Sequence, residues 1–310
     1  MIRHLRTRYW VGLIGLILIA VILTVSGCGS SPPKQKGPAI DADLERFNRA
    51  GRLAFDKGRL QQAASFYRKA LDRAYVRDDT AAILNAQYNL AICLMNLQSY
   101  KAALVVVENA NSEMALADRG DSIDFLLLEA TILHRLGDSD EAWKITYQIL
   151  SNPAQASSAV RSKTYFLRGL IASKKGDKGQ LRESIAALGQ PEHPRLLADR
   201  EELVGHLAMA EQNWDAAIKA FDLSAKLRRE ALDYRGMVNV LALAGNASEK
   251  AERTRESAIF YLRAGRSAAL QGLFDDAQKW LNQSVKLASN AGEDKIIQEA
   301  RNCLQQIEEK

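Results

Sequence analysis

The feature of this sequence that most constrains its fold is a pattern of small residues that recurs about every 40 residues. In the stretch FNRAGRLAFDKGRLQQAASFYRKAL, residues 47–71, alanine and glycine stand where an amphipathic helix normally carries Leu or Ile. The small residue of the first helix returns at Gly51, Ala91, Ala130, Gly169, Gly205 and Gly265. The first four intervals are 40, 39, 39 and 36 residues, a spacing typical of stacked helical repeats.

A second set of small residues follows each of the first and predicts a helix pair in every repeat. Its members are Ala63, Ala103, Ala142, Leu181 out of pattern, Ala217 and Ala277. Small side chains on facing helices let the helix axes approach closely. Glycines between the two sets predict the turns, at Gly58, Gly137, Gly176 and Gly272. Strand signals are almost absent, so we expect an all-helical body of about fourteen helices.

The pattern resembles the tetratricopeptide repeat (TPR), with a bulky residue opening the first helix, a glycine at the turn and small residues at two points of the second helix. The resemblance covers most of residues 44–290. It implies an all-α, TPR-type solenoid of about six to seven antiparallel helix pairs in a right-handed superhelix. Residues 291–310 are then a capping helix. The fourth copy departs at Leu181, and residues 231–253 form a long helix with no clear partner turn.

The N-terminus has the layout of an export signal. The basic segment MIRHLRTR precedes the uncharged apolar run of residues 9–25, and residues 1–27 are the predicted signal peptide. The tetrapeptide VSGC, ending at Cys28, resembles the lipobox of bacterial lipoproteins, which implies a covalent lipid on Cys28. Residues 28–43, rich in Ser, Pro and Gly, predict a flexible tether.

The lipoprotein resemblance also implies a location. Gly29, and not Asp, follows the cysteine, so the resemblance implies a lipid anchor in the outer membrane, facing the periplasm. A run of this length also fits a short membrane span. An uncleaved, membrane-anchored TPR protein therefore stays an alternative.

Composition and motifs argue against several function classes. The chain has 42 Lys and Arg against 37 Asp and Glu; three arginines lie in the N-terminal segment, and the near-neutral remainder argues against a nucleic-acid partner. Cys93 and Cys303 predict free thiols, and four scattered histidines predict no metal site. No catalytic, nucleotide-binding or cofactor motif is present, so we expect no enzyme, no cofactor and no small-molecule substrate.

Protein binding is the remaining function, and the resemblance implies a concave groove lined by the first helices. By register, the lining residues are Asn48, Arg52, Phe55, Asn85, Tyr88, Ile92, Asn96, Phe166, Leu170, Glu202, His206 and Met209. TPR domains that clamp a C-terminal carboxylate need a cation in the third repeat, where this chain has Asp124 and Leu128, although Asn89 matches the second. We expect a scaffold or adaptor for proteins or peptides of the bacterial envelope, in an outer-membrane, pilus or cell-wall complex. The alternative is an accessory subunit of a cell-wall-acting enzyme.

Overall fold

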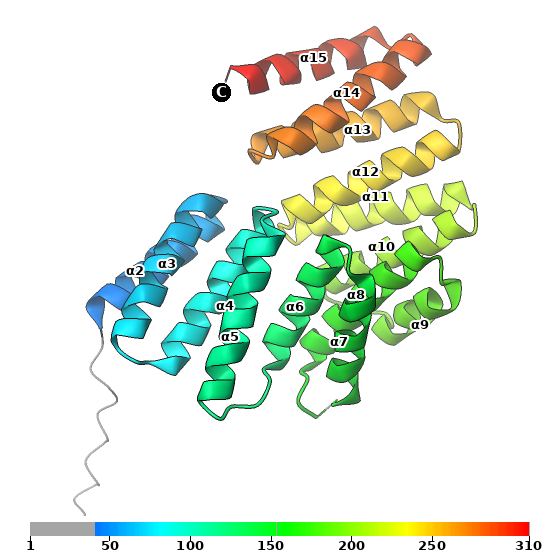
Figure 1. The fold of residues 1–310 in the computed structure, drawn as a ribbon. Coiled ribbons are helices and arrows are strands. Elements are labelled where there is room, and N and C mark those ends of the chain that lie inside the picture. Colours follow the sequence, from blue (N-terminus) through cyan, green and yellow to red (C-terminus); the bar gives the residue numbers. More distant parts are fainter. Residues whose placement is uncertain (1–40, 153, 310) are drawn as a thin grey trace, which may run out of the picture. The chain divides into compact units, whose positions relative to one another are not determined.

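The computed structural model describes residues 41–152 and 154–309. The predicted signal peptide, Cys28 and most of the predicted tether lie outside these residues. Residues 43–310 form one compact unit. The described residues contain no strand and fourteen helices, drawn in Figure 1: α2 (Ala42–Asp56), α3 (Leu60–Val76), α4 (Thr80–Asn96), α5 (Tyr100–Leu116), α6 (Ile123–Leu136), α7 (Ser139–Ser151), α8 (Ser158–Lys175), α9 (Lys178–Leu188), α10 (Pro194–Ala210), α11 (Trp214–Glu230), α12 (Tyr234–Lys250), α13 (Thr254–Leu270), α14 (Phe274–Ala291) and α15 (Asp294–Glu308).

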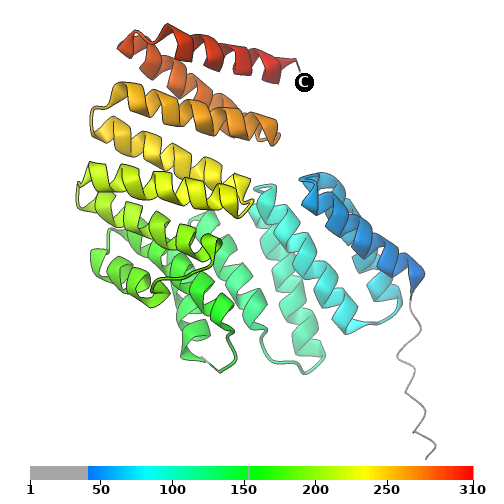
Figure 2. The ribbon, with the colours of Figure 1, turned by 180° about the vertical axis from the view of Figure 1, so that it is seen from behind.

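The helices stack in the order of the sequence, as Figures 1 and 2 show from opposite sides. From α3 onward, nearly every helix packs on the next one along the chain, and the first helices of neighbouring pairs also touch, α4 with α6, α6 with α8 and α8 with α10. This is a TPR-like solenoid, and the predicted all-α fold class is confirmed. The predicted capping segment contains α15, which packs on both α13 and α14.

The small residues lie at the helix contacts, as the repeat pattern predicts. All twelve predicted positions, six in each set, are buried. A Cβ atom added at Gly51 would lie 2.8 Å from the ring of Tyr67, and one at Gly205 would lie 2.5 Å from the ring of Phe221. Each glycine thus makes room for an aromatic ring of the next helix. Where two helix backbones lie this close, a side chain fits on one helix but not at the facing position of the other.

The segment 231–253 shows no clear turn signal in the sequence, but the structure places a turn at its end, followed by a partner helix. The segment contains α12, which residues 251–253 join to α13. In this turn Glu252, and not glycine, adopts the left-handed conformation, with φ of 59°, as Gln98 and Gln212 do in the turns of two other pairs. Gly245 of α12 faces Tyr261 of α13, so this pair repeats the contact between Gly51 and Tyr67.

The fourth pair, α8 and α9, differs from the others. Helix α9 has 11 residues, the fewest of the described helices. Leu181, which stands at the small position, is fully buried and packs with Leu188 and Leu203. Gly169 meets Leu203 of α10, where the repeat pattern would put a residue of α9. The larger Leu181 therefore fills space at a pair whose second helix is short.

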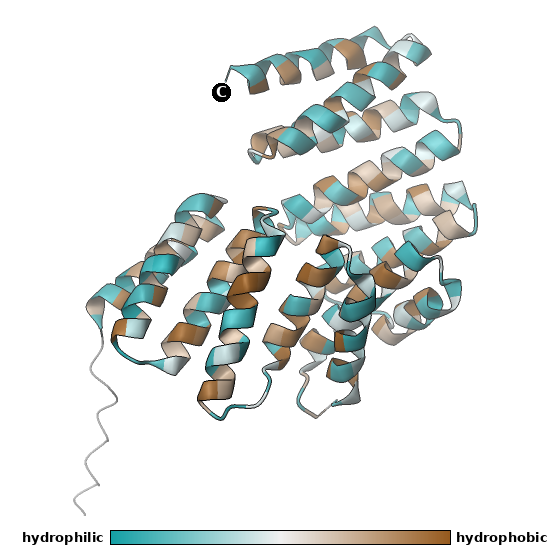
Figure 3. Ribbon diagram, viewed as in Figure 1, coloured by the Kyte–Doolittle hydropathy of each residue, from teal (hydrophilic) through white to brown (hydrophobic). Residues whose placement is uncertain are grey.

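The turns and the hydropathy of the helices are those of a helical repeat array. The predicted turn residues Gly58 and Gly137 have φ of 71° and 101°, which side chains rarely adopt. Hydrophilic and hydrophobic residues are mixed along each helix in Figure 3. Among the described helices, none is sufficiently long and apolar to span a bilayer.

Candidate functional site

The residues predicted to line the groove all lie on first helices of pairs. Asn48, Arg52 and Phe55 lie on α2, followed by four residues on α4 and two on α8, and Glu202, His206 and Met209 lie on α10. The structure brings the residues of α2, and those of α4 except Asn96, together around two hollows that share Asn85 as a lining residue. It places those of α8 and α10 in different surroundings.

The first hollow lies between α2 and α4 and has a volume of about 240 Å³. Five of the predicted residues line it, joined by Tyr67 and Asn89: Asn48, Arg52, Phe55, Asn85 and Ile92. Tyr67, on the second helix α3, contributes the ring that covers Gly51. Burial raises the pKa of Tyr67, and the neighbouring Cys93 raises it further, so the phenol stays neutral and can donate a hydrogen bond.

Three asparagines give this hollow its hydrogen-bonding character. The Nδ2 of Asn89 donates to the backbone oxygen of Asn85 at 2.8 Å and to its Oδ1 at 3.0 Å. The Oδ1 of Asn48 is buried and has no hydrogen-bond partner among the described residues. A buried acceptor without a donor costs free energy. That oxygen is enclosed by the protein itself, so it is not offered to a ligand in the hollow.

The second hollow lies between α4, α6 and the loop that precedes α6, and has a volume of about 410 Å³. It shares Asn85 with the first hollow and is more apolar. Its lining includes Leu84, Tyr88, Met114 and Phe125, with Arg119 and Asp124 also present. The rings of Tyr88 and Phe125 meet edge to face, 5.5 Å apart. Burial, followed by the charge of Asp124, raises the pKa of Tyr88.

Asn96 ends α4 and lines neither hollow. Its Nδ2 donates to the backbone oxygen of Ile92 at 2.9 Å, and its own backbone oxygen accepts a hydrogen bond from the guanidinium of Arg235. This residue joins the α4 end to the start of α12. The side-chain amide of Asn96 is therefore already hydrogen-bonded within the protein.

The predicted residues of α8 and α10 pack into the array. Phe166 and Leu170 are half-buried against the core around Leu181, and Met209 is half-buried against the C-terminal core. His206 meets the ring of Phe221 edge to face at 5.4 Å, and burial lowers its pKa. Glu202 is buried and paired with Arg228. These side chains contribute to packing and to a buried ion cluster.

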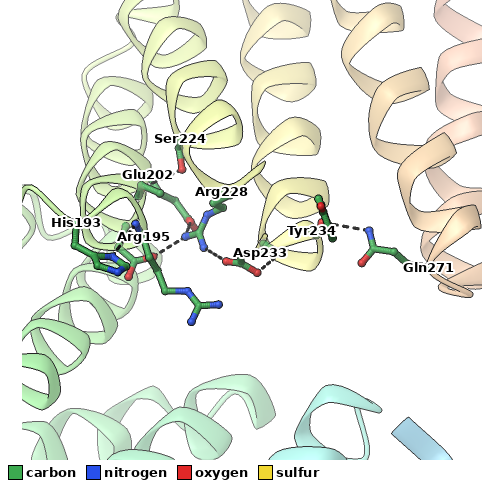
Figure 4. A network of polar contacts seen from close by, with 11 residues as sticks. His193, Arg195, Glu202, Ser224, Arg228, Asp233, Tyr234 and Gln271 are labelled. Atoms are coloured by element: carbon green, nitrogen blue, oxygen red, sulfur yellow. Dashed lines mark hydrogen bonds and ion pairs between the residues drawn. The ribbon is translucent and has the colours of Figure 1, made fainter. Parts of the chain in front are cut away.

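That cluster surrounds Arg228 of α11, as Figure 4 shows. The guanidinium binds Asp199 at 2.8 Å, Asp233 at 2.6 Å and Glu202. Burial raises the pKa of Asp199 to about 6, although the charge of Arg228 opposes this rise. Burial disfavours the Arg228 cation, but the three carboxylates together hold its pKa above the usual value. The repeat pattern does not predict this cluster, because its members belong to two helices, α10 and α11, and to the turn before α12.

The described residues hold no arrangement suited to catalysis or metal binding. No group of three or more His, Cys, Asp or Glu side chains among them could hold a metal ion. Cys93 and Cys303 are free, and burial raises the pKa of Cys93 to about 11. A thiol of that pKa is a poor nucleophile at neutral pH. The buried carboxylates of Asp199 and Glu202 are both bound to Arg228.

A scan against protein families matches the tetratricopeptide repeat at residues 44–75, which hold α2 and α3. No curated protein matches the chain. The match confirms the predicted TPR for this first pair, and no enzyme family was found.

Solved structures with a similar fold cover most of the chain. The Rap conjugation gene regulator of plasmid pLS20, in complex with the Phr peptide, is 15% identical, with a TM-score of 0.57 over 91% of this chain and 81% of that one. The apo form of the quorum sensor NprR from B. thuringiensis is 11% identical, with a TM-score of 0.56 over 88% of this chain and 89% of that one. At these identities the likeness shows the fold alone.

Proposed function

Because this chain is a tetratricopeptide repeat protein, we propose that it is a non-catalytic scaffold that binds an extended segment of another protein across α2, α4 and α6. The observation that carries the proposal is the pair of hollows joined at Asn85. Their lining residues come mainly from α2, α4 and α6, the first helices of three successive pairs. That is where a solenoid presents its binding face.

The chemistry of the two hollows favours a peptide in extended form. The amides of Asn48, Asn85 and Asn89 line the first hollow and can exchange hydrogen bonds with a peptide backbone. An apolar side chain two residues further along the peptide fits the hollow around Tyr88 and Phe125. One solved structure of similar fold, the Rap regulator, contains the Phr peptide. That likeness supports peptide binding as the mode.

We further propose that the scaffold is held at a membrane of the bacterial envelope by lipid on Cys28, with residues 28–43 as the tether. The basic N-terminal segment, the apolar run and the VSGC tetrapeptide support this proposal. Mass spectrometry of the mature chain tests it. The expected N-terminus is a lipidated Cys28, and an intact Met1 would contradict lipoprotein processing.

Photo-crosslinking in living cells tests the binding surface. A benzoylphenylalanine placed at Tyr88 lies in the second hollow, while one placed at Tyr147 lies on α7 with its side chain 67% exposed. Both replace a tyrosine, so reactivity and size are matched. We expect a discrete crosslinked envelope protein from position 88 alone. The same product from both positions, or none from position 88, contradicts the proposed groove.

Single substitutions define the groove chemically. Replacing Asn48 or Asn85 with Ala should weaken binding of the captured segment by about 1–2 kcal/mol each, since each removes hydrogen bonds in a water-poor site. Asn282, exposed on α14, provides the control. Equal affinities for N48A, N85A and N282A would place binding elsewhere.

A further inference from the structure

The charge of this protein is segregated along the array. The chain as a whole is close to balance, but residues 42–77, which hold α2 and α3, contain nine Lys and Arg against four Asp and Glu. Residues 78–310 contain 28 Lys and Arg against 32 Asp and Glu. Most of the cations of the first pair are exposed: Arg46, Arg49, Arg52, Lys57, Arg59, Arg68 and Lys69.

Part of this charge lies on one face that joins α2 to α3. Arg46, Arg49 and Leu53 are spaced along one side of α2, and all three are exposed. The guanidinium of Arg46 lies 5.1 Å from the ring centroid of Phe47. The Nζ of Lys69 lies 6.0 Å from the Phe47 ring and 5.8 Å from the Phe66 ring, which brings α3 to the same face. We call this surface, formed by Arg46, Phe47, Arg49, Leu53, Phe66 and Lys69, the basic end face.

The basic end face belongs to the first described pair, so no earlier repeat of the described chain covers it. A polar outer face on a terminal repeat is what solubility requires. Solubility alone does not select a sign of charge, however. The last pair, residues 274–309, carries four Lys and Arg against seven Asp and Glu. The two ends of the array are therefore oppositely charged, and the positive end is the one that the tether enters.

We infer that the basic end face docks on the anionic phospholipid surface of the membrane that anchors the chain. The inference rests on the proposed lipid anchorage. Only 17 residues separate Cys28 from Arg46, which limits their separation to about 65 Å even when fully extended. The face combines cations with two aromatic rings and an exposed leucine 55% accessible to solvent. Cations bind lipid phosphates, and apolar side chains enter the headgroup layer.

This composition favours a bilayer over nucleic acid. A nucleic-acid surface tracks phosphates with many cations and loses affinity steeply with salt. Here three cations alternate with apolar groups over two helices. Each cation near an anionic leaflet strengthens association about fivefold. Arg46 is paired with Asp43 at 3.1 Å, so Arg49 and Lys69 count in full and together shift the ratio of docked to undocked chains about 25-fold, an effect that adds to the anchor and orients the array on the membrane.

The test uses the full chain in vesicles of phosphatidylcholine, with or without about a quarter of phosphatidylglycerol, and with spin-labelled headgroups as quenchers. A fluorescent amino acid is placed at Gln62, exposed on α3 one turn before Phe66, or at Asn290, exposed on α14. We expect quenching at position 62 that needs phosphatidylglycerol and is lost at high salt, and none at position 290. Equal quenching at both positions, or equal quenching in both lipids, overturns the inference.

Charge reversal separates docking from anchorage. The triple variant R46E, R49E and K69E should lose the quenching at position 62 while still floating with the vesicles. The control triple K219E, K250E and K286E changes net charge equally at exposed positions outside the first pair and should keep it. A chain that does not float with phosphatidylcholine vesicles contradicts the anchorage. The phosphatidylglycerol comparison still decides the docking, because electrostatic binding needs no lipid anchor. Retained quenching in R46E, R49E and K69E overturns the inference.

Discussion

Replacing Gly205 with Ala measures how closely the helices nest. In an open helix this change stabilises a protein by about 1 kcal/mol, because alanine has the higher helix propensity. At Gly205 the new Cβ atom would lie 2.5 Å, 2.6 Å and 2.8 Å from three atoms of the Phe221 ring. Phe221 is fully buried, so the ring has little room to move. Overpacking of this kind costs about 1–3 kcal/mol.

The three close contacts favour the upper part of this packing cost, and after the propensity gain is subtracted we expect G205A to be less stable than the parent by up to about 2 kcal/mol. Urea unfolding followed by circular dichroism measures the change. Gly120 is the control, because a Cβ atom there meets nothing within 4 Å, and G120A should unfold like the parent. The double variant with Phe221→Leu should recover part of the loss. A G205A protein as stable as the parent, or more stable, would refute close nesting at this contact.

Three further substitutions test the packing and the buried ion cluster. Ala217→Leu should overpack α10 against α11, because Ala217 is fully buried. We expect it to lower the free energy of unfolding by about 1–3 kcal/mol, and an unchanged thermal melt would contradict the repeat register. Burial raises the pKa of Asp199 to about 6 from 3.8, so its contribution to stability is largest below pH 4 and is lost as the pH rises through 6. Asp199→Asn should remove that dependence between pH 4 and pH 6, and an unchanged slope would contradict it. Arg228→Met leaves three carboxylates without their shared cation and should lower the free energy of unfolding by about 3–5 kcal/mol. Chemical denaturation at pH 7 measures this change, and a loss below about 1 kcal/mol would contradict the paired cluster.

The helix array could be predicted because one repeated physical requirement shapes the sequence. Close helix contact requires a small residue at a fixed interval, and Gly51, Ala91 and Ala130 satisfy it in register. The prediction fell short at Gly245, which lies 40 residues after Gly205 and faces Tyr261 but was not recognised as a member of the first set. Glu252 holds the left-handed conformation of the turn between α12 and α13, and nothing in its local sequence marks that turn.

The groove could be predicted in part. Register alone places side chains on first helices, and on α2 and α4 the placement coincides with the two hollows. Asn89 was missed as a lining residue, although it lies one helical turn after Asn85. The repeat register does not predict how deeply a side chain is buried, because burial depends on the neighbouring helices. Glu202 is buried because Arg228 reaches it from α11, a contact between residues 26 positions apart.

Charge counting over the whole chain hid the basic end face. The total of 42 Lys and Arg against 37 Asp and Glu is nearly balanced, but the helix pairs divide it unequally. Electrostatic attraction acts over about 8 Å at physiological ionic strength. The relevant count is therefore that of one surface, which the fold defines.

Hydrogen–deuterium exchange of the chain with and without the crosslinked partner tests the binding groove most directly. We predict slower exchange in α2, α4 and the start of α6, the helices whose side chains line the two hollows, and unchanged exchange in α11 and α13. Protection confined to α11 and α13, with α2 and α4 unaffected, would contradict a partner bound across the first helices.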